Sequence, residues 1–119
     1  MSYLKKRKNA LALAGSGLIE AFRTEPHLMV HGIIALLVIN LGFYFTISRT
    51  EWFAVAGCIA LVISLELVNS ALEKLCDLVM PDQHPKIKYV KDVAAAAVLV
   101  ACILSVIIGC LVFIPHLRS

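Results

Sequence analysis

Three carboxylates follow directly on an apolar run and share one predicted helix face. The run spans residues 52–65, and the next segment reads Glu66-Leu-Val-Asn69-Ser70-Ala-Leu-Glu73-Lys-Leu-Cys-Asp77. At about 100° per residue, the five numbered side chains point to one side of a helix. A carboxylate inside a bilayer costs on the order of 2.5–3.5 kcal/mol, so this acidic face indicates a function.

The ends of the predicted spans bring further polar groups to the same level. From topology alone, we expect polar side chains at three helix ends to meet at the cytoplasmic interface: Glu25, Glu73, Asp77, His84, Lys91 and Asp92. Mg²⁺ typically takes one or two carboxylates together with phosphate oxygens. A nearby lysine offers a point charge to phosphate. Glu66 lies deeper, where a carboxylate suits a general acid or base.

Structural explanations of the same residues remain open. Glu66 could pair with a neighbouring helix, and Asn69 could form a hydrogen bond between helices. Glu73 could be an interfacial charge, and Glu25 could interact with a helix dipole. Asp77 could be only a polar helix end. Likewise, a positive-inside lysine and its local partner would account for Lys91 and Asp92.

The composition indicates an integral membrane protein. Of the 119 residues, 61% are hydrophobic and 16% charged, whereas a soluble domain is nearer half apolar and a quarter charged. Apolar residues gather in three predicted spans, 27–46, 51–79 and 91–114, with a cytoplasmic loop over 80–90. We therefore expect one all-α membrane domain over residues 1–119. Thr24 is predicted to cap the first span, Ser48 or Thr50 the second, and Pro115 to end the third.

The first 24 residues have the periodicity of an amphipathic helix. Leu4, Leu11, Leu18 and Phe22 fall within about 40° on a helical wheel, with polar residues opposite. This pattern favours a helix on the cytoplasmic membrane surface. A cleaved signal peptide is the alternative.

The basic residues are distributed unevenly between the two sides of the predicted membrane. Of the 11 lysines and arginines, five precede the first span, four lie around the loop between the second and third, and two lie on the other side. The positive-inside rule then places the N-terminus and that loop in the cytoplasm. Because the basic N-terminus leads straight into membrane segments, it favours contact with anionic lipid and no nucleic-acid partner.

Other features carry less information. The alanines of residues 94–97 predict a close contact with the acidic face of the second span. We interpret His27 and His31 as interfacial polar residues rather than as ligands. The cysteines lack C-x-x-C spacing and read as small buried hydrophobes: Cys58, Cys76, Cys102 and Cys110. No phosphate-binding loop or protein-kinase motif is present, so any phosphoryl transfer needs an unrelated site.

Two motifs make the chain resemble the membrane-embedded prokaryotic diacylglycerol kinase family, which includes undecaprenol kinases. The segment from Glu66 to Asp77 matches every fixed position of the family pattern E-x-x-N-[ST]-x-[IL]-E-x-x-x-D. A histidine followed seven residues later by Lys-Asp and a run of small residues appears from His84 onward. Glu25 matches the glutamate before the first span. The resemblance covers almost the whole chain.

This resemblance implies a lipid kinase, which transfers the γ-phosphate of ATP, with Mg²⁺, to the hydroxyl of diacylglycerol or undecaprenol. It implies that Glu66 is the catalytic base and that Glu66 and Ala95 meet the lipid substrate. Glu25 and Glu73 become the metal ligands. The implied nucleotide-binding residues are Lys6, Glu25, Asn69, Glu73, Asp77, His84, Lys91 and Asp92.

The resemblance also implies a homotrimer in the bacterial inner membrane, with an active site shared between subunits. Three short helices alone shelter a polar face poorly, which independently favours an oligomer. Leu13 stands where relatives have a tyrosine, and Ala95 or Ala96 where the diacylglycerol-kinase branch commonly has Ser or Gly. The sequence His84-Pro85-x-x-Lys88 looks more like the undecaprenol-kinase branch.

Two other functions fit parts of the pattern. A small proton-coupled transporter subunit also carries a membrane-buried glutamate, although such proteins usually have four spans. A midplane transport site has no need of the acidic and basic groups at the helix ends. A non-catalytic membrane partner protein is the second alternative.

Overall fold

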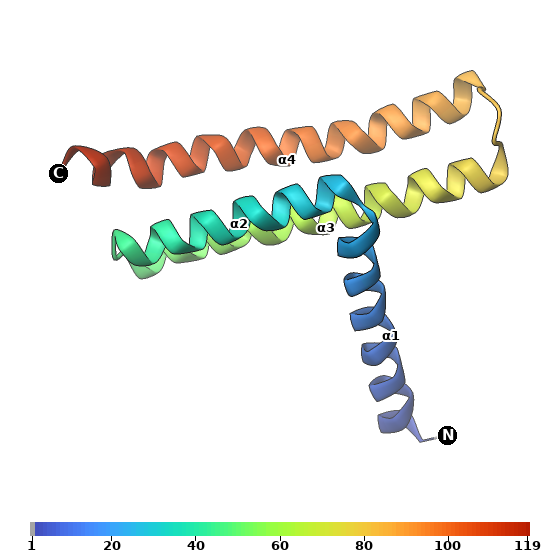
Figure 1. The fold of residues 1–119 in the computed structure, drawn as a ribbon, viewed down its shortest axis with the longest axis horizontal. Coiled ribbons are helices and arrows are strands. Elements are labelled where there is room, and N and C mark those ends of the chain that lie inside the picture. Colours follow the sequence, from blue (N-terminus) through green and yellow to red (C-terminus); the bar gives the residue numbers. More distant parts are fainter. Residues whose placement is uncertain (1) are drawn as a thin grey trace.

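The chain folds into four α-helices and, within the described residues 2–119, no strand. In this computed structural model the helices are α1 (Tyr3–Thr24), α2 (Pro26–Tyr44), α3 (Arg49–Val79) and α4 (Pro85–Arg118). Helices α2, α3 and α4 lie side by side, whereas α1 leaves their bundle crosswise (Figure 1). Each of the three bundled helices is long and apolar enough to cross a membrane. The prediction of an all-helical fold with three long apolar helices is thus confirmed, and this arrangement is consistent with a membrane protein.

Helix α3 holds the bundle together because it packs against both of its neighbours. Its packing is most extensive against α4 and less so against α2. At the end of the bundle near the α2–α3 turn, Ile47, Val55 and Val112 form a buried apolar cluster, extended by partly buried side chains from all three helices. This cluster fixes one end of α3, whereas the polar segment lies towards its other end.

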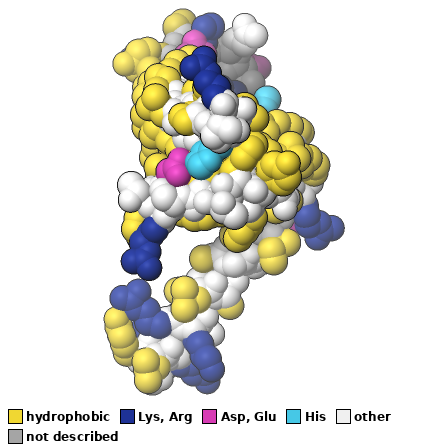
Figure 2. Space-filling model, turned by 90° about the vertical axis from the view of Figure 1, so that its left-hand side faces the viewer, with side chains coloured by type: hydrophobic (Ala, Val, Ile, Leu, Met, Phe, Trp, Pro, Cys, Tyr) yellow, Lys and Arg dark blue, Asp and Glu magenta, His cyan; other side chains and the backbone are white. Residues whose placement is uncertain are grey.

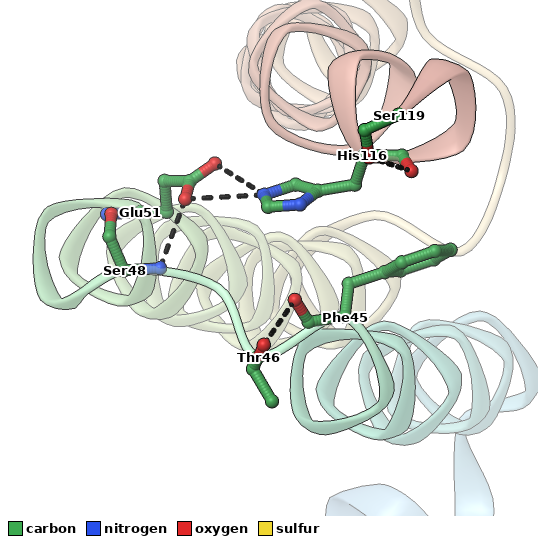
Figure 3. A network of polar contacts seen from close by, with 6 residues as sticks. All are labelled: Phe45, Thr46, Ser48, Glu51, His116 and Ser119. Atoms are coloured by element: carbon green, nitrogen blue, oxygen red, sulfur yellow. Dashed lines mark hydrogen bonds and ion pairs between the residues drawn. The ribbon is translucent and has the colours of Figure 1, made fainter.

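The turn between α2 and α3 is closed by local hydrogen bonds. The Ser48 hydroxyl accepts from the Glu51 amide at 3.2 Å, and the Ser48 amide donates to Glu51 Oε1 at 3.0 Å. This capping box satisfies two backbone groups at the start of α3 and confirms Ser48 among the two predicted caps. Glu51 also contacts Nε2 of His116 at 3.2 Å, which ties the turn to the end of α4 (Figure 3).

Three predicted helix ends were wrong. Glu25 rather than Thr24 precedes α2, because Thr24 continues α1 and its hydroxyl donates to the Glu20 carbonyl. The predicted loop over 80–90 is shorter, since His84 caps α4 and Pro85 suits its first position. Helix α4 also continues through Pro115 to Arg118. A proline so near a helix end removes one backbone hydrogen bond, and the His116 contact to Glu51 holds the last turn.

Two glycines allow close approaches between helices. A Cβ added at Gly42 in α2 would lie 2.6 Å from Cη2 of Trp52 in α3. A Cβ at Gly32 would lie 3.0 Å from the Phe22 ring, where the end of α1 meets α2. Because these glycines have no side chain, α3 can approach α2 closely at Gly42 and α1 can do so at Gly32.

Large apolar surfaces remain exposed on the single chain. Figure 2 shows hydrophobic side chains over the sides of the bundle and basic side chains on the protruding helix. No residue of α1 is buried, and its exposed side chains include Leu4 and Leu11. Apolar patches of this extent are typical of surfaces that face lipid or another subunit. Met1, the first residue of the predicted surface helix, lies outside the described residues.

Candidate active site

The polar segment of α3 becomes more exposed from the middle of the helix towards its end. Glu66, Asn69 and Ser70 are buried, Glu73 is half-buried, and Asp77 is exposed. The 3.6-residue period places these side chains on one face, as expected. The structure therefore presents one continuous polar strip, with a buried carboxylate at one end and an accessible carboxylate at the other.

Asn69 lies at the centre of this strip and is only partly satisfied. Its Nδ2 donates to Glu73 Oε1 at 3.3 Å, but its buried Oδ1 accepts no hydrogen bond in the described chain. A buried polar atom without a partner costs about 1–3 kcal/mol. Asn69 thus offers an acceptor to a group that the isolated chain does not supply.

Glu25 reaches the strip from the break between α1 and α2. Its carboxylate is 18% exposed and lies 3.4 Å from Nζ of Lys74, the neighbour of Glu73 in sequence. Glu25 and the Glu73 segment thus meet at the same end of α3. Among residues 2–119, no group of three or more histidine, cysteine or acidic side chains is placed to hold a metal ion. Two carboxylates and an amide oxygen nonetheless fit Mg²⁺, which takes hard oxygen ligands and keeps phosphate or water in its remaining positions.

The end of α3 and the start of α4 are joined by a salt bridge. Nζ of Lys91 lies 2.5 Å from Oδ1 of Asp77, which confirms that these residues from different helices meet. Asp92 instead pairs with Lys88 in the same helix at 2.6 Å. The exposed position of these pairs leaves Lys91 and Asp77 free to exchange partners at small cost.

The structure does not bring two predicted nucleotide residues to this cluster. His84 caps its own helix, and its Nδ1 accepts from the Lys86 amide at 3.1 Å. Lys6 is exposed near the far end of α1, which points away from the bundle (Figure 1). From Lys6 to Thr24 the helix rises about 27 Å, at about 1.5 Å per residue. Within one chain, Lys6 therefore lies far from Glu25.

The alanine run contacts α3 through one face only, which corrects the prediction that the whole run does so. Ala94 is half-buried, whereas Ala95, Ala96 and Ala97 are exposed. The buried positions that follow are Val98 and Ala101. Their spacing of four and three residues is that of one helix face, so consecutive alanines necessarily point in different directions. Ala95 thus faces outward, where it is accessible to lipid or to another subunit.

One contact of the buried carboxylate was missed by the sequence reading. His31 Nε2 in α2 lies 3.5 Å from Oε2 of Glu66, and their side chains are 22% and 7% exposed. His31 is therefore no simple interfacial residue. The sequence carried no signal of this contact, because apolar residues surround α2 and only the structure shows that His31 lies near the face of buried Leu28 and Ala35.

An apolar cavity of about 460 Å³ lies between α2, α3 and α4 and reaches His31. Its lining is almost wholly aliphatic and aromatic, with residues such as Ala35, Val62 and Phe113. Its size is within the range of small-molecule pockets, about 300–1,000 Å³. The buried Glu66–His31 pair thus borders a space suited to hydrocarbon.

The cysteines are all free thiols. Cys76 is buried as predicted, and Cys58 and Cys102 are half-buried. The prediction is wrong for Cys110, which is exposed. Because Cys110 also lines the apolar cavity, its exposure reflects the open side of that cavity rather than a polar surface.

The sequence model of the family described as prokaryotic diacylglycerol kinase matches residues 12–113, most of the chain. The chain belongs to this family. The match includes the whole polar strip, Glu25, His31 and every cavity-lining residue except Ile114, but not Lys6. The family resemblance and the prediction of a membrane lipid kinase are therefore confirmed at the level of the family.

Individual relatives carry two different names. An undecaprenol kinase of Bacillus subtilis is 41% identical over 87% of this chain and 85% of its own length. A diacylglycerol kinase of Synechocystis is 35% identical over 89% of this chain and 61% of its own. A diacylglycerol kinase of Pseudomonas aeruginosa is 33% identical over 82% and 80%. The alternative of a proton-coupled transporter finds no support among them.

Proposed function

We propose that this member of the prokaryotic diacylglycerol kinase family transfers the γ-phosphate of ATP to the hydroxyl of a membrane lipid alcohol. The observation that carries the proposal is the polar strip of α3, which runs from buried Glu66 to exposed Asp77. The acceptor comes from the bilayer and ATP from water, so a single helix face that joins both environments can bring them together.

The exposed end of the strip, near Glu73 and Asp77, is assigned to the phosphate donor, Mg-ATP. Glu25 and Glu73 would hold Mg²⁺, which neutralises phosphate charge when bound. The unpaired Oδ1 of Asn69 supports this assignment, since it requires a partner from outside the chain. Lys91 can leave Asp77 for a phosphate oxygen. The proposed nucleotide set also keeps His84, Asp92 and Lys6.

The buried end of the strip, at Glu66, is assigned to the phosphate acceptor, the lipid alcohol. Glu66 removes the hydroxyl proton as the hydroxyl oxygen attacks the γ-phosphorus. The adjoining cavity is apolar and suits the hydrocarbon next to the hydroxyl. Ala95 remains the other proposed lipid contact. The relative named undecaprenol kinase, at 41% identity, and the segment from His84 to Lys88 favour undecaprenol over diacylglycerol.

We propose that three copies assemble in the bacterial inner membrane with the N-terminus in the cytoplasm. The exposed apolar sides of the bundle and the partly satisfied Asn69 support a site completed by a neighbouring subunit. The excess of basic residues before α2 and around residues 80–90 supports the orientation. Helix α1, with basic residues and exposed leucines, would then lie on the membrane surface.

The direct test is phosphate transfer from radiolabelled ATP by the purified, reconstituted protein. The acceptor panel is undecaprenol, shorter polyprenols and diacylglycerol, and kcat/KM is compared among them. Label in the undecaprenol product, lost when Mg²⁺ is removed, is the expected result. If no lipid alcohol of the panel accepts phosphate, the proposal is wrong.

A further inference from the structure

Glu66 and His31 are in contact in the middle of the bundle. The other contacts between acidic and basic side chains among residues 2–119 lie near helix ends, where water is accessible. The Glu66–His31 contact, at 3.5 Å, joins the buried carboxylate of α3 to a ring that is 22% exposed. The His31 ring is therefore less enclosed than the Glu66 carboxylate.

A histidine has properties at this position that other partners lack. A lysine or arginine would hold Glu66 in its charged form, and an apolar residue would leave it without a partner. An imidazole can both orient a carboxylate and exchange a proton with it near neutral pH. The ring also lines the apolar cavity, so it lies between Glu66 and the space assigned to the acceptor hydrocarbon.

The groups around His31 come from α2, α3 and α4, and α1 packs beside the next residue, Gly32. From α3 His31 faces Glu66, and from α4 the Cys102 thiol lines the same cavity. Helix α1 contributes the apolar Phe22 ring beside Gly32. On its own helix, His27 is exposed one turn earlier. Glu66 is thus the carboxylate that His31 contacts directly.

We infer that His31 is a positioning residue that orients Glu66 and takes up the proton that Glu66 removes from the lipid hydroxyl. The inference rests on the proposed function. The hydroxyl O–H bond breaks as its oxygen bonds to the γ-phosphorus, and the bond from that phosphorus to the ADP oxygen breaks. The proton passes to Glu66 and then to Nε2 of a neutral His31. It leaves along the polar strip, towards the exposed end at Asp77, once the products are released. Glu66 is thereby ready for the next turnover.

The test uses the reconstituted full-length protein and three variants, His31→Ala, His31→Gln and His27→Ala. His31→Gln keeps a polar side chain but cannot take up a proton, and His27→Ala is a matched control because His27 is an exposed histidine one turn earlier in α2. We expect both His31 variants to lose about 10²-fold in kcat, with KM for ATP unchanged. Added imidazole should restore turnover to His31→Ala, because the lost ring leaves space beside the cavity. It should not restore Glu66→Gln.

The outcomes separate this inference from the proposed function. If the wild-type protein phosphorylates no lipid alcohol, the proposed function fails. If the wild type is active and Glu66→Gln is not, but His31→Gln turns over like the wild type, the inference alone is wrong. Failure of imidazole to restore a folded His31→Ala variant would also overturn it. If His31→Ala does not fold, the kcat of His31→Gln tests the inference, and a wild-type kcat would overturn it.

Discussion

Asn69 shows how a single side chain can be shaped for a ligand rather than for stability. Its amide nitrogen bonds to Glu73, but its buried oxygen has no partner in the described chain. Such an atom weakens the isolated fold by about 1–3 kcal/mol. A residue kept at this cost is best explained by a group that binds to it.

Replacing Asn69 by leucine should therefore separate stability from activity. Leucine has the same branched shape and no unpaired oxygen, so we expect Tm in detergent to be no lower than that of the wild type. Loss of the amide should reduce phosphate transfer by about 10²-fold, the usual effect of removing one preorganised polar group. Thermal unfolding and turnover are measured on one preparation. Full turnover in Asn69→Leu would exclude a ligand contact.

Replacing Glu73 by glutamine should affect the metal more than the lipid. We expect the midpoint of the Mg²⁺ titration to rise at least about ten-fold, because one charged oxygen ligand is lost. Glu20→Gln is the control, since Glu20 is an exposed carboxylate of α1 outside the site. A superimposable Mg²⁺ titration for Glu73→Gln and the wild type would rule out the ligand role.

The sequence revealed the residues of the strip but not all their partners. An acidic residue inside a membrane span is costly, so Glu66 could be recognised directly. His31 could not be paired with it, because hydropathy does not say which side of α2 turns towards α3. Asp92 was expected among the interhelical groups, but the local partner Lys88, one turn away, is closer.

At the scale of helices, the position of the site depends on how closely α2 approaches α3. Gly42 lies against the Trp52 ring, and Trp52 also packs on Phe43 with ring centroids 4.9 Å apart. This contact sits near the turn, at the opposite end of the bundle from Glu25. This contact therefore helps to hold α2 against α3, and the packing of these two helices places His31 beside Glu66.

Replacing Gly42 by alanine should destabilise the bundle. Its methyl group would start 2.6 Å from the Trp52 ring, and relieving that clash should cost about 1–3 kcal/mol. Gly57→Ala in α3 is the matched control, since nothing lies within 4 Å of its added Cβ. We expect Tm to fall for Gly42→Ala and to stay level or rise for Gly57→Ala. Equal stability of both variants would contradict this close approach.

The helices were predictable from hydropathy, but their ends were not. The existence and the order of the three spans could be predicted from the apolar runs, because every membrane-spanning helix contains such a run. The ends depend on local geometry. Pro85 could begin a helix because its predecessor, His84, caps it, and Pro115 could lie inside one because only one turn follows. The alanine run was misjudged because composition was read without the helical period.

At the scale of the whole molecule, a single chain leaves its proposed site incomplete. Glu25, Asn69 and Glu73 lie at one end of α3, but no metal-binding cluster of three side chains forms within residues 2–119. Lys6 is far from them on the same chain. The exposed apolar sides of the bundle offer the surface through which a second copy could contribute. The poorly sheltered polar face already favoured an oligomer, but the residues that a second copy would contribute could not be predicted from one sequence by physical arguments.

Activity should therefore depend on assembly. We expect native mass spectrometry in mild detergent to find three copies, and turnover to be lost as dilution or harsher detergent separates them. Both quantities are measured on the same samples. An active monomer, or full turnover after dissociation, would contradict a site shared between subunits.

The proposed phosphate transfer depends on Glu66, and Glu66→Gln tests it most directly. The substitution keeps the size and burial of the side chain but removes its ability to take a proton. Turnover of radiolabelled ATP with undecaprenol should fall by about 10²–10⁴-fold, while assembly and ATP binding remain as in the wild type. Phosphorylation of the lipid by Glu66→Gln at the wild-type rate would contradict the account.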